Sequence, residues 1–134
     1  MYKVMALDIG TKRIGIALSD FLLVMASGHS YIQRNPEQEA LKQIQNIAAE
    51  NKVEKIVVGI PINMDGTKGF QAEDCLEFSK KIAGYEIIYE DERLTSDTAE
   101  ENLRERKIDF RKEKGLVDVE SARLILEQYL SRKQ

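Results

Sequence analysis

The sequence contains one cysteine and one histidine, and this scarcity excludes several kinds of site. Cys75 has no second cysteine for an intramolecular disulfide, and no cysteine or histidine lies beside it at zinc-ligand spacing. His29 is the only histidine available for catalysis, and no partner for it is visible nearby. We therefore expect Cys75 to be a small buried hydrophobe, at helical spacing from Phe78 and Ile82, and His29 to be a strand or loop residue.

Long apolar runs and compositionally biased tracts are also missing. No apolar run approaches the roughly 18 residues of a membrane span, and the N-terminus MYKVMALD lacks the pattern of a signal peptide. With 43% hydrophobic residues and only 2 prolines in 134 residues, the chain can bury a core and has too little bias for disorder. We expect residues 1–134 to form a single soluble domain, located in the cytoplasm and without a membrane partner.

Charge is nearly balanced over the whole chain but is unevenly placed. The 20 Lys and Arg residues and 23 Asp and Glu residues give a formal net charge of -3. The middle of the chain is acidic, whereas the segment 104–114 is basic, with Arg104, Arg106, Lys107, Arg111, Lys112 and Lys114 against Glu105, Asp109 and Glu113. Such a local excess predicts a surface for a polyanion, although a solvated helix and loop has the same composition.

Apolar periodicity predicts alternating strands and helices. The clearest strand is KIVVGIP, a continuous apolar run typical of a strand buried on both faces. We expect strands over 2–7, 13–18, 30–33, 55–61 and 86–89, and helices over 36–50, 70–83, 97–106 and 118–130. Asn35 is the expected cap of the first helix, and Gly84 the stop of the second. The pattern predicts an α/β fold with a mixed five-stranded sheet, antiparallel at one side, and helices on both faces.

Acidic residues stand at the predicted strand ends, where α/β sheets form their sites. Asp8 ends an apolar strand, and the triplet Glu90-Asp91-Glu92 follows the fifth strand. Because side chains alternate along a strand, Glu90 and Glu92 share one face and Asp91 takes the other. Asp118 is expected to begin the last helix, on the stripe that faces the sheet.

Three carboxylates from two strand ends and a helix start could bind divalent cations such as Mg²⁺ or Mn²⁺, which prefer oxygen ligands. Two such ions can stabilise both oxygens of an in-line phosphoryl displacement. The residues alone leave a second interpretation open, in which Asp118 caps a helix, Asp8 forms a turn before Gly10, and the triplet is a solvated strand end.

Four ordered blocks resemble the YqgF family: LDIGTKRIGIALSD at 7–20, VVGIPINMDGT at 57–67, DERLTS at 91–96 and DVESARLIL at 118–126. The resemblance covers nearly the full chain. It implies a ribonuclease H-like fold of the Holliday-junction-resolvase branch and an activity as a pre-16S rRNA nuclease. The sequence departs from the family pattern at Ser121, where the last helix usually carries an alanine pair.

The resemblance also implies roles for individual residues. Asp8, Glu92 and Asp118 match the catalytic, metal-binding carboxylates. Glu92 is preferred by analogy with related resolvases that use a glutamate after this strand, and Asp91 remains the alternate.

Four further residues are expected to bind substrate. The resemblance to the YqgF family implies that Lys12, Arg13 and Arg93 lie beside the metals, where they would hold phosphates or stabilise transition-state charge. Asn63, in the glycine-containing loop 59–66, is a further candidate for a phosphate or sugar contact. The alternatives are surface ion pairing for the three cations and a simple turn for Asn63.

We therefore expect a hydrolase, a metal-dependent endonuclease that processes the 5' end of pre-16S rRNA in ribosome biogenesis. Its expected partners are pre-ribosomal RNA and the ribosomal particle, and its expected state is a monomer or weak homodimer. A Holliday-junction resolvase acting on branched DNA is one alternative, and it would need a dimer. A non-catalytic RNA-binding assembly factor is another. A phosphotransferase is a third, because Asp8-Ile-Gly-Thr resembles the phosphate loop of actin-like kinases, but one domain is too short to enclose a nucleotide.

Overall fold

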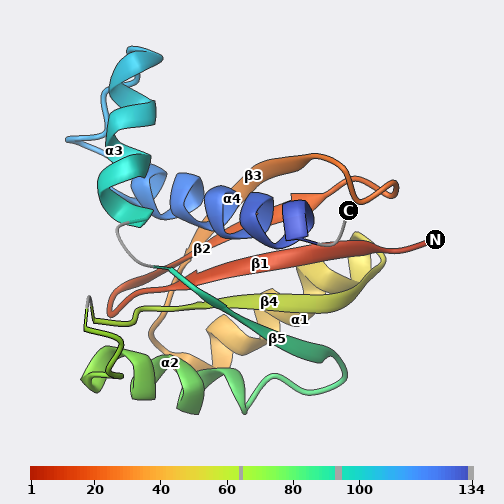
Figure 1. The fold of residues 1–134 in the computed structure, drawn as a ribbon. Coiled ribbons are helices and arrows are strands. Elements are labelled where there is room, and N and C mark those ends of the chain that lie inside the picture. The colour runs from red at the N-terminus through yellow and green to blue at the C-terminus, as the bar shows by residue number, and fades with distance from the viewer. Residues whose placement is uncertain (64, 93–94, 133–134) are drawn as a thin grey trace.

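A computed structural model describes residues 1–63, 65–92 and 95–132 of the chain. It contains a five-stranded sheet of order β3-β2-β1-β4-β5, with α4 on one face and α1 and α2 on the other (Figure 1). The elements are β1 (Lys3–Ile9), β2 (Arg13–Ser19), β3 (Ala26–Gln33), α1 (Glu37–Glu50), β4 (Val53–Ile60), α2 (Phe70–Ser79), β5 (Glu86–Asp91), α3 (Thr95–Glu105) and α4 (Gly115–Arg132).

The sheet is mixed, as the sequence predicted. β1 pairs antiparallel with β2 and parallel with β4, while β2 pairs antiparallel with β3 and β4 parallel with β5. The parallel strands β1, β4 and β5 therefore end at the same edge, next to the turn between β1 and β2.

Among the described helices, none has the length and apolarity needed to cross a lipid bilayer.

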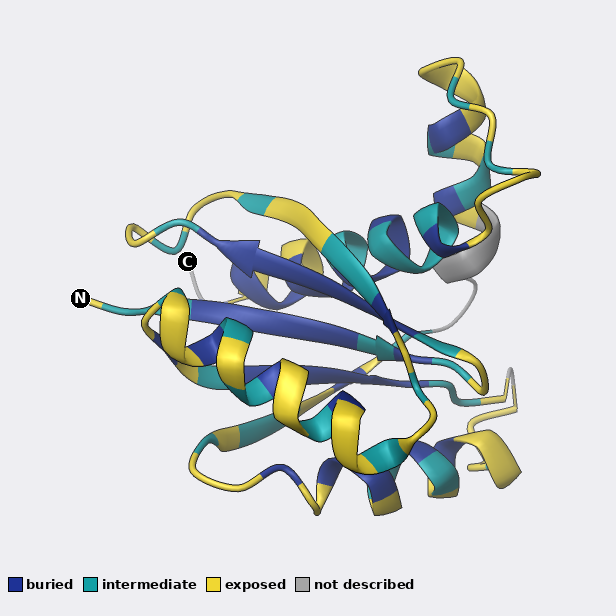
Figure 2. Cartoon of the chain, turned by 180° about the vertical axis from the view of Figure 1, so that it is seen from behind, coloured by how far each residue is buried: buried dark blue, intermediate teal, exposed yellow. Residues whose placement is uncertain are grey.

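The central strands are buried because helices cover both faces of the sheet (Figure 2). On the α1 and α2 face, Leu7 and Val58 pack in one cluster with Ile44 and Phe78. On the α4 face a second cluster contains the small residues Val4, Ala6, Ala17 and Val57 beneath Ala122, Ile125 and Leu126. Since side chains alternate along β1, Asp8 has the same orientation as Val4 and Ala6 and so faces α4.

Several element boundaries differ from the predicted ones, and the last helix matters most for the site. α4 begins at Gly115 rather than at Asp118, so Asp118 lies in its first turn and is not its cap. α1 has Pro36 rather than Asn35 at its N-cap position, without a side-chain cap. α2 ends at Ser79, and Gly84 adopts a positive φ of 92° in the turn that follows.

β3 is longer than predicted because it is an edge strand with mostly exposed or half-buried side chains, which leave no apolar pattern. His29 lies on this strand, exposed, in agreement with its expected structural role. Cys75 is buried in α2, as expected, and its Sγ donates a hydrogen bond to the carbonyl of Ile9 at 3.4 Å.

α3 leaves the sheet and packs against α4 (Figure 1). The buried carboxylate of Glu120 in α4 joins the two helices, because it accepts hydrogen bonds from Asn102 of α3 and from Arg106, the residue after α3, each at 3.1 Å. Arg123 binds the same carboxylate at 2.7 Å. This network fixes α3 beside the beginning of α4.

Two glycines let the beginning of α4 lie directly on the sheet. A Cβ at Gly15 would overlap the backbone carbonyl of Asp118, and a Cβ at Gly28 would lie 2.6 Å from Cγ1 of Val119. Gly15 is also the partner of Asp8 in the β1–β2 register. The close approach at Gly15 thus places the first turn of α4 next to the end of β1.

We expect Gly15→Ala to destabilise the protein by roughly 3 kcal/mol, because its methyl group meets backbone atoms that cannot rotate away. Gly28→Ala should cost less, since it meets only the side chain of Val119. Urea unfolding, followed by circular dichroism, measures both free energies. Equal stability of Gly15→Ala and wild type would show that α4 does not depend on this contact.

Candidate active site

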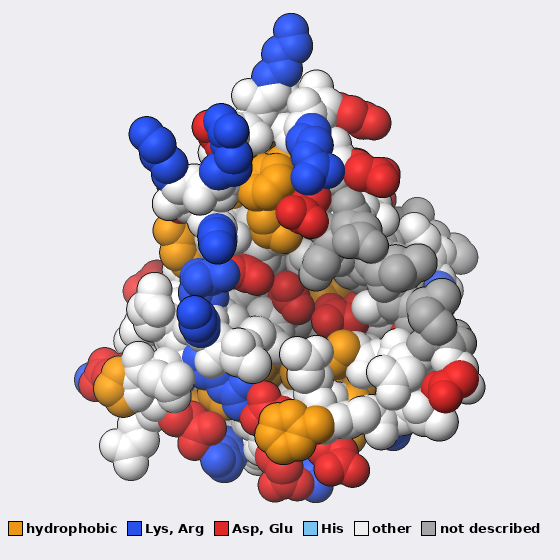
Figure 3. Space-filling model, turned by 90° about the vertical axis from the view of Figure 1, so that its left-hand side faces the viewer, with side chains coloured by type: hydrophobic (Ala, Val, Ile, Leu, Met, Phe, Trp, Pro, Cys, Tyr) orange, Lys and Arg blue, Asp and Glu red, His pale blue; other side chains and the backbone are white. Residues whose placement is uncertain are grey.

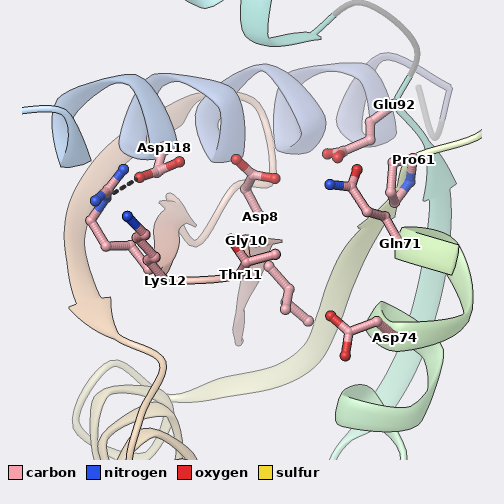
Figure 4. A pocket seen from close by; sticks show the side chains of 11 residues that line it. Asp8, Gly10, Thr11, Lys12, Pro61, Gln71, Asp74, Glu92 and Asp118 are labelled. Carbon is pink, nitrogen blue, oxygen red and sulfur yellow. Dashed lines mark hydrogen bonds and ion pairs between the residues drawn. The ribbon is translucent and has the colours of Figure 1, made fainter.

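A pocket of about 270 Å³ opens at the edge of the sheet where β1 and β4 end. Asp8, Glu92 and Asp118 line it, together with Lys12, Arg13 and Gln71 (Figure 4). The three carboxylates come from the end of β1, the residue after β5 and the first turn of α4. The fold thus brings together the three acids that the sequence singled out.

The backbone fixes Glu92 in this pocket. Its N–H donates a hydrogen bond to the carbonyl of Ile60 at 3.1 Å, which continues the pairing of β4 with β5 by one residue. Its carboxylate lies over Gly59, where a Cβ would overlap Oε2. A side chain at position 59 would therefore displace Glu92 from the pocket.

The half-buried side chains of Asp8 and Glu92 form a carboxyl pair (Figure 4). Oε2 of Glu92 is buried and has no hydrogen-bond partner among the described residues. Burial, and then the neighbouring charge of Asp8, raise the pKa of Glu92 above its usual range. Burial, and then the charge of Asp118, likewise raise the pKa of Asp8. Near neutral pH the pair therefore keeps a proton, which a bound divalent cation would displace.

Asp118 has a different environment. Its Oδ2 accepts a hydrogen bond from Nε of Arg13 at 2.8 Å, and its side chain is 21% exposed. Burial raises the pKa of Asp118, while the bond to Arg13 opposes that effect. Lys12 is exposed at the mouth of the pocket, where its side chain forms no hydrogen bond or ion pair with any residue the structure describes. Both cations are therefore close enough to the carboxylates to meet a phosphate.

An ion pair that sequence analysis did not predict lies at the base of this pocket. Arg34 binds both oxygens of Asp74, at 2.6 and 2.8 Å, and donates to the carbonyl of Gly10 at 2.9 Å. Its guanidinium also lies over the ring of Phe78, 5.1 Å from the centroid. Hydrogen bonding to Arg34 lowers the pKa of Asp74. Because Arg34 and Asp74 are 40 residues apart, no local pattern could connect them.

The structure separates Asp91 from Glu92. Asp91 is exposed at the end of β5 and is not among the residues that line the pocket, whereas Glu92 is. Glu90 is buried and is bound by Gln128 and Arg132 of α4, so Glu90 and Glu92 both face α4, as strand alternation predicted. This placement favours Glu92 over Asp91 as a ligand.

Two predicted substrate contacts are not found in the pocket. Asn63 lies outside it, and its side chain donates to Oγ1 of Thr67 at 3.0 Å, within its own loop. Arg93 lies outside the described residues. Lys12 and Arg13 line the pocket, so they remain the cations through which this site would bind substrate.

The donor set fits a hard divalent cation, although the side chains are not arranged around one. Asp8 and Glu92 offer carboxylate oxygens, the ligands that Mg²⁺ and Mn²⁺ prefer, and one of these oxygens is buried without a partner. Within the described part of the chain, no three acidic, cysteine or histidine side chains form a ready metal site. Asp118 is bound to Arg13 instead, so a three-carboxylate site requires that this ion pair open.

The strand order, the mixed sheet and the carboxylates at its edge define a ribonuclease H-like fold, as predicted. RuvC of T. thermophilus, solved in complex with a Holliday junction substrate, has this fold, with a TM-score of 0.60 at 12% identity over 99% of this chain and 96% of that one. Residues 2–132 match the RuvX family, described as Holliday junction resolvase. The chain belongs to this family, which confirms the resemblance in the four sequence blocks.

Relatives in two cyanobacterial genera carry the name "Putative pre-16S rRNA nuclease". The protein of Picosynechococcus sp. is 41% identical over 133 residues, which cover 97% of this chain and 92% of that protein. The protein of Trichormus variabilis is 40% identical over 129 residues, 94% of this chain and 85% of that protein. The similarity therefore extends over nearly the whole of each chain.

The raised pKa values predict how stability depends on pH without divalent cations. The folded protein binds more protons than the unfolded chain above about pH 4, so its free energy of unfolding should fall as the pH rises from about 5 to 8. Asp8→Asn removes one charge of the pair. It should therefore raise stability at pH 8 by about 2 kcal/mol and flatten the pH dependence.

Thermal unfolding in chelator at several pH values tests this, with Asp91→Asn as the matched control. Asp91 is exposed, and its charge is the smallest of the effects that raise the pKa of Glu92, so its substitution should change the pH profile much less than Asp8→Asn does. If Asp8→Asn and Asp91→Asn show the same dependence of thermal stability on pH, the Asp8 and Glu92 pair is not the cause of that dependence.

Proposed function

We propose that this chain is a metal-dependent endonuclease that hydrolyses a phosphodiester bond near the 5' end of precursor 16S rRNA. One observation carries the chemistry: the carboxyl of Glu92 lies beside Asp8 at the end of the central strands, and its buried Oε2 has no hydrogen-bond partner among the described residues. Two acids do not occupy such a position for stability, because each raises the free energy of ionising the other. The names of the relatives supply the substrate class.

In this proposal Asp8, Glu92 and Asp118 bind Mg²⁺ or Mn²⁺. When bound, such an ion makes water a stronger nucleophile and neutralises charge on the reacting phosphate. Asp8 and Glu92 supply the buried ligands. Asp118 changes partner, releasing Arg13, and the freed guanidinium can then donate to phosphate oxygens. Lys12 at the mouth contributes a second positive charge toward the substrate.

The proposal treats residues 1–134 as one nuclease domain that acts as a monomer or weak homodimer. A precursor ribosomal RNA places its action in the cytoplasm, during ribosome biogenesis, and allows a ribosomal particle to present the substrate. The net charge of -3 gives little general attraction to nucleic acid, so local cations or a partner particle must position the RNA.

The family description favours a second candidate, resolution of four-way DNA junctions. The same carboxylates would serve that reaction. A resolvase, however, must cut two symmetric strands, which calls for a dimer with two active sites. Measuring the mass of the protein on junction DNA distinguishes this candidate from a monomeric ribonuclease.

Cleavage of labelled precursor 16S rRNA and of a four-way DNA junction tests the proposal. With Mg²⁺ or Mn²⁺ we expect cleavage of the RNA, no cleavage in chelator, and a loss of at least about 100-fold in Asp8→Asn and Glu92→Gln. Asp91→Asn is the matched control and should retain activity. Preferential cutting of the junction would support the second candidate. Equal activity of wild type and Asp8→Asn would refute carboxylate-metal catalysis.

If neither substrate is cut by folded protein that binds RNA, the assay should be repeated on precursor ribosomal particles. If the RNA in the particles is not cut either, the nuclease proposal is overturned and a non-catalytic assembly factor is supported.

A further inference from the structure

A second hollow of about 420 Å³ continues directly from the carboxylate pocket. Arg13 and Asp118 line both. The second hollow adds Phe110, Arg111 and Lys114 from the loop between α3 and α4, together with Glu100 of α3 and Val117 of α4. Phe110 and Arg111 also line a third hollow of about 450 Å³ farther along the same loop. The hollows form a path that leads from the candidate active site past an aromatic ring.

Figure 3 shows this face of the molecule. Lys and Arg side chains follow one side of the hollow that holds acidic side chains, and hydrophobic side chains lie between the acidic and basic groups. Besides Arg13, the cationic side chains that line the second and third hollows come from the segment 104–114: Arg104, Lys107, Arg111 and Lys114. Their position beside the carboxylates favours a ligand-binding role over simple solvation.

The loop that carries Phe110 is fixed at both ends. At its start the N–H of Ile108 donates to the carbonyl of Leu103 at 2.9 Å. At its end the hydroxyl of Tyr31 donates to Glu113 at 2.8 Å, and a Cβ at Gly115 would lie 2.5 Å from the ring of Tyr31. Phe110 is therefore held near the active site by the sheet and by α3.

The chemistry around Phe110 suits a nucleotide. The guanidinium of Arg104 lies 5.5 Å from the centroid of the half-buried ring, an arrangement that supports stacking of a nucleobase beside it. The side chain of Lys114 forms no hydrogen bond or ion pair with any described residue. Arg104 lies 4.0 Å from the half-buried Glu100, and Arg111 lies 3.0 Å from the exposed Asp109. Such surface pairs exchange readily for phosphate.

We propose that this second hollow is a nucleotide subsite, in which an unpaired base next to the cleaved bond stacks on Phe110 while its phosphate contacts Lys114. The inference rests on the proposed nuclease function and specifies its substrate more narrowly. A base inside a duplex has both faces covered by its neighbours, so stacking on Phe110 selects single-stranded RNA at the cut. Fully paired nucleic acid would lack this contact.

The chain has no tryptophan, so Phe110→Trp introduces a single fluorescent reporter. Phe21→Trp is the matched control. Phe21 is also partly exposed beneath a cation, with Nζ of Lys3 5.0 Å from its ring, but it follows the opposite end of β2. Both reporters are placed in Asp8→Asn protein, so that the probe, a single-stranded RNA of about ten nucleotides, is not cut.

On adding the RNA we expect the fluorescence of Phe110→Trp to fall at least about twofold and that of Phe21→Trp to stay constant. Blunt duplex RNA should not quench the Phe110→Trp signal. Phe110→Ala should weaken binding of labelled single-stranded RNA about tenfold, and Phe110→Tyr should restore it. Lys114→Gln should lower the slope of log affinity against log salt concentration by the equivalent of about one phosphate contact.

The subsite would be overturned if Phe110→Trp fluorescence stays unchanged at RNA concentrations that saturate binding in an anisotropy measurement. It would also be overturned if the protein does not bind RNA, or if RNA quenches both reporters equally. The test does not depend on cleavage. If RNA quenches Phe110→Trp but wild-type protein cuts neither free RNA nor precursor ribosomal particles, the proposed function is refuted while binding of RNA at Phe110 stands. If wild-type protein cuts RNA but RNA does not quench Phe110→Trp, only the subsite is refuted.

Discussion

The pairing of the half-buried carboxyl groups of Asp8 and Glu92 is the constraint on which the site depends. Asp8 enters from β1 and Glu92 from the residue after β5, and burial raises the pKa of each. The chain accepts this unfavourable electrostatic energy because well-packed apolar clusters on both faces of the sheet offset it. A divalent cation turns the same arrangement into a favourable one, which is why the pair indicates function.

Close backbone packing sets the geometry around this pair. Gly59 leaves room for the carboxylate of Glu92, and Gly15 lets α4 approach until Asp118 stands beside the end of β1. The third acid is bound by Arg13, so the site combines a buried pair with one exchangeable ion pair. The path past Phe110 begins at Arg13 and Asp118, so the proposed nucleotide subsite adjoins the three carboxylates.

Much of the fold could be predicted from local patterns. The run around Val57 predicted the buried strand β4, and strand alternation placed Glu90 and Glu92 on one face. Edge strand β3 was underestimated because its side chains are largely exposed. Close packing at Gly15 depends on contacts between residues about 100 positions apart, which periodicity does not report. For the same reason the Arg34–Asp74 pair and the true start of α4 could not be anticipated.

Titration calorimetry of Mn²⁺ into the protein near pH 8 tests the central claim most directly, that the Asp8 and Glu92 pair is a cation site. The account predicts that wild type binds Mn²⁺ and that binding releases protons, because the raised pKa values leave the Asp8 and Glu92 carboxyls partly protonated. Both Asp8→Asn and Glu92→Gln should lose Mn²⁺ binding. Asp91→Asn should bind as wild type does. No Mn²⁺ binding to wild type, or binding that survives both substitutions, would contradict the account.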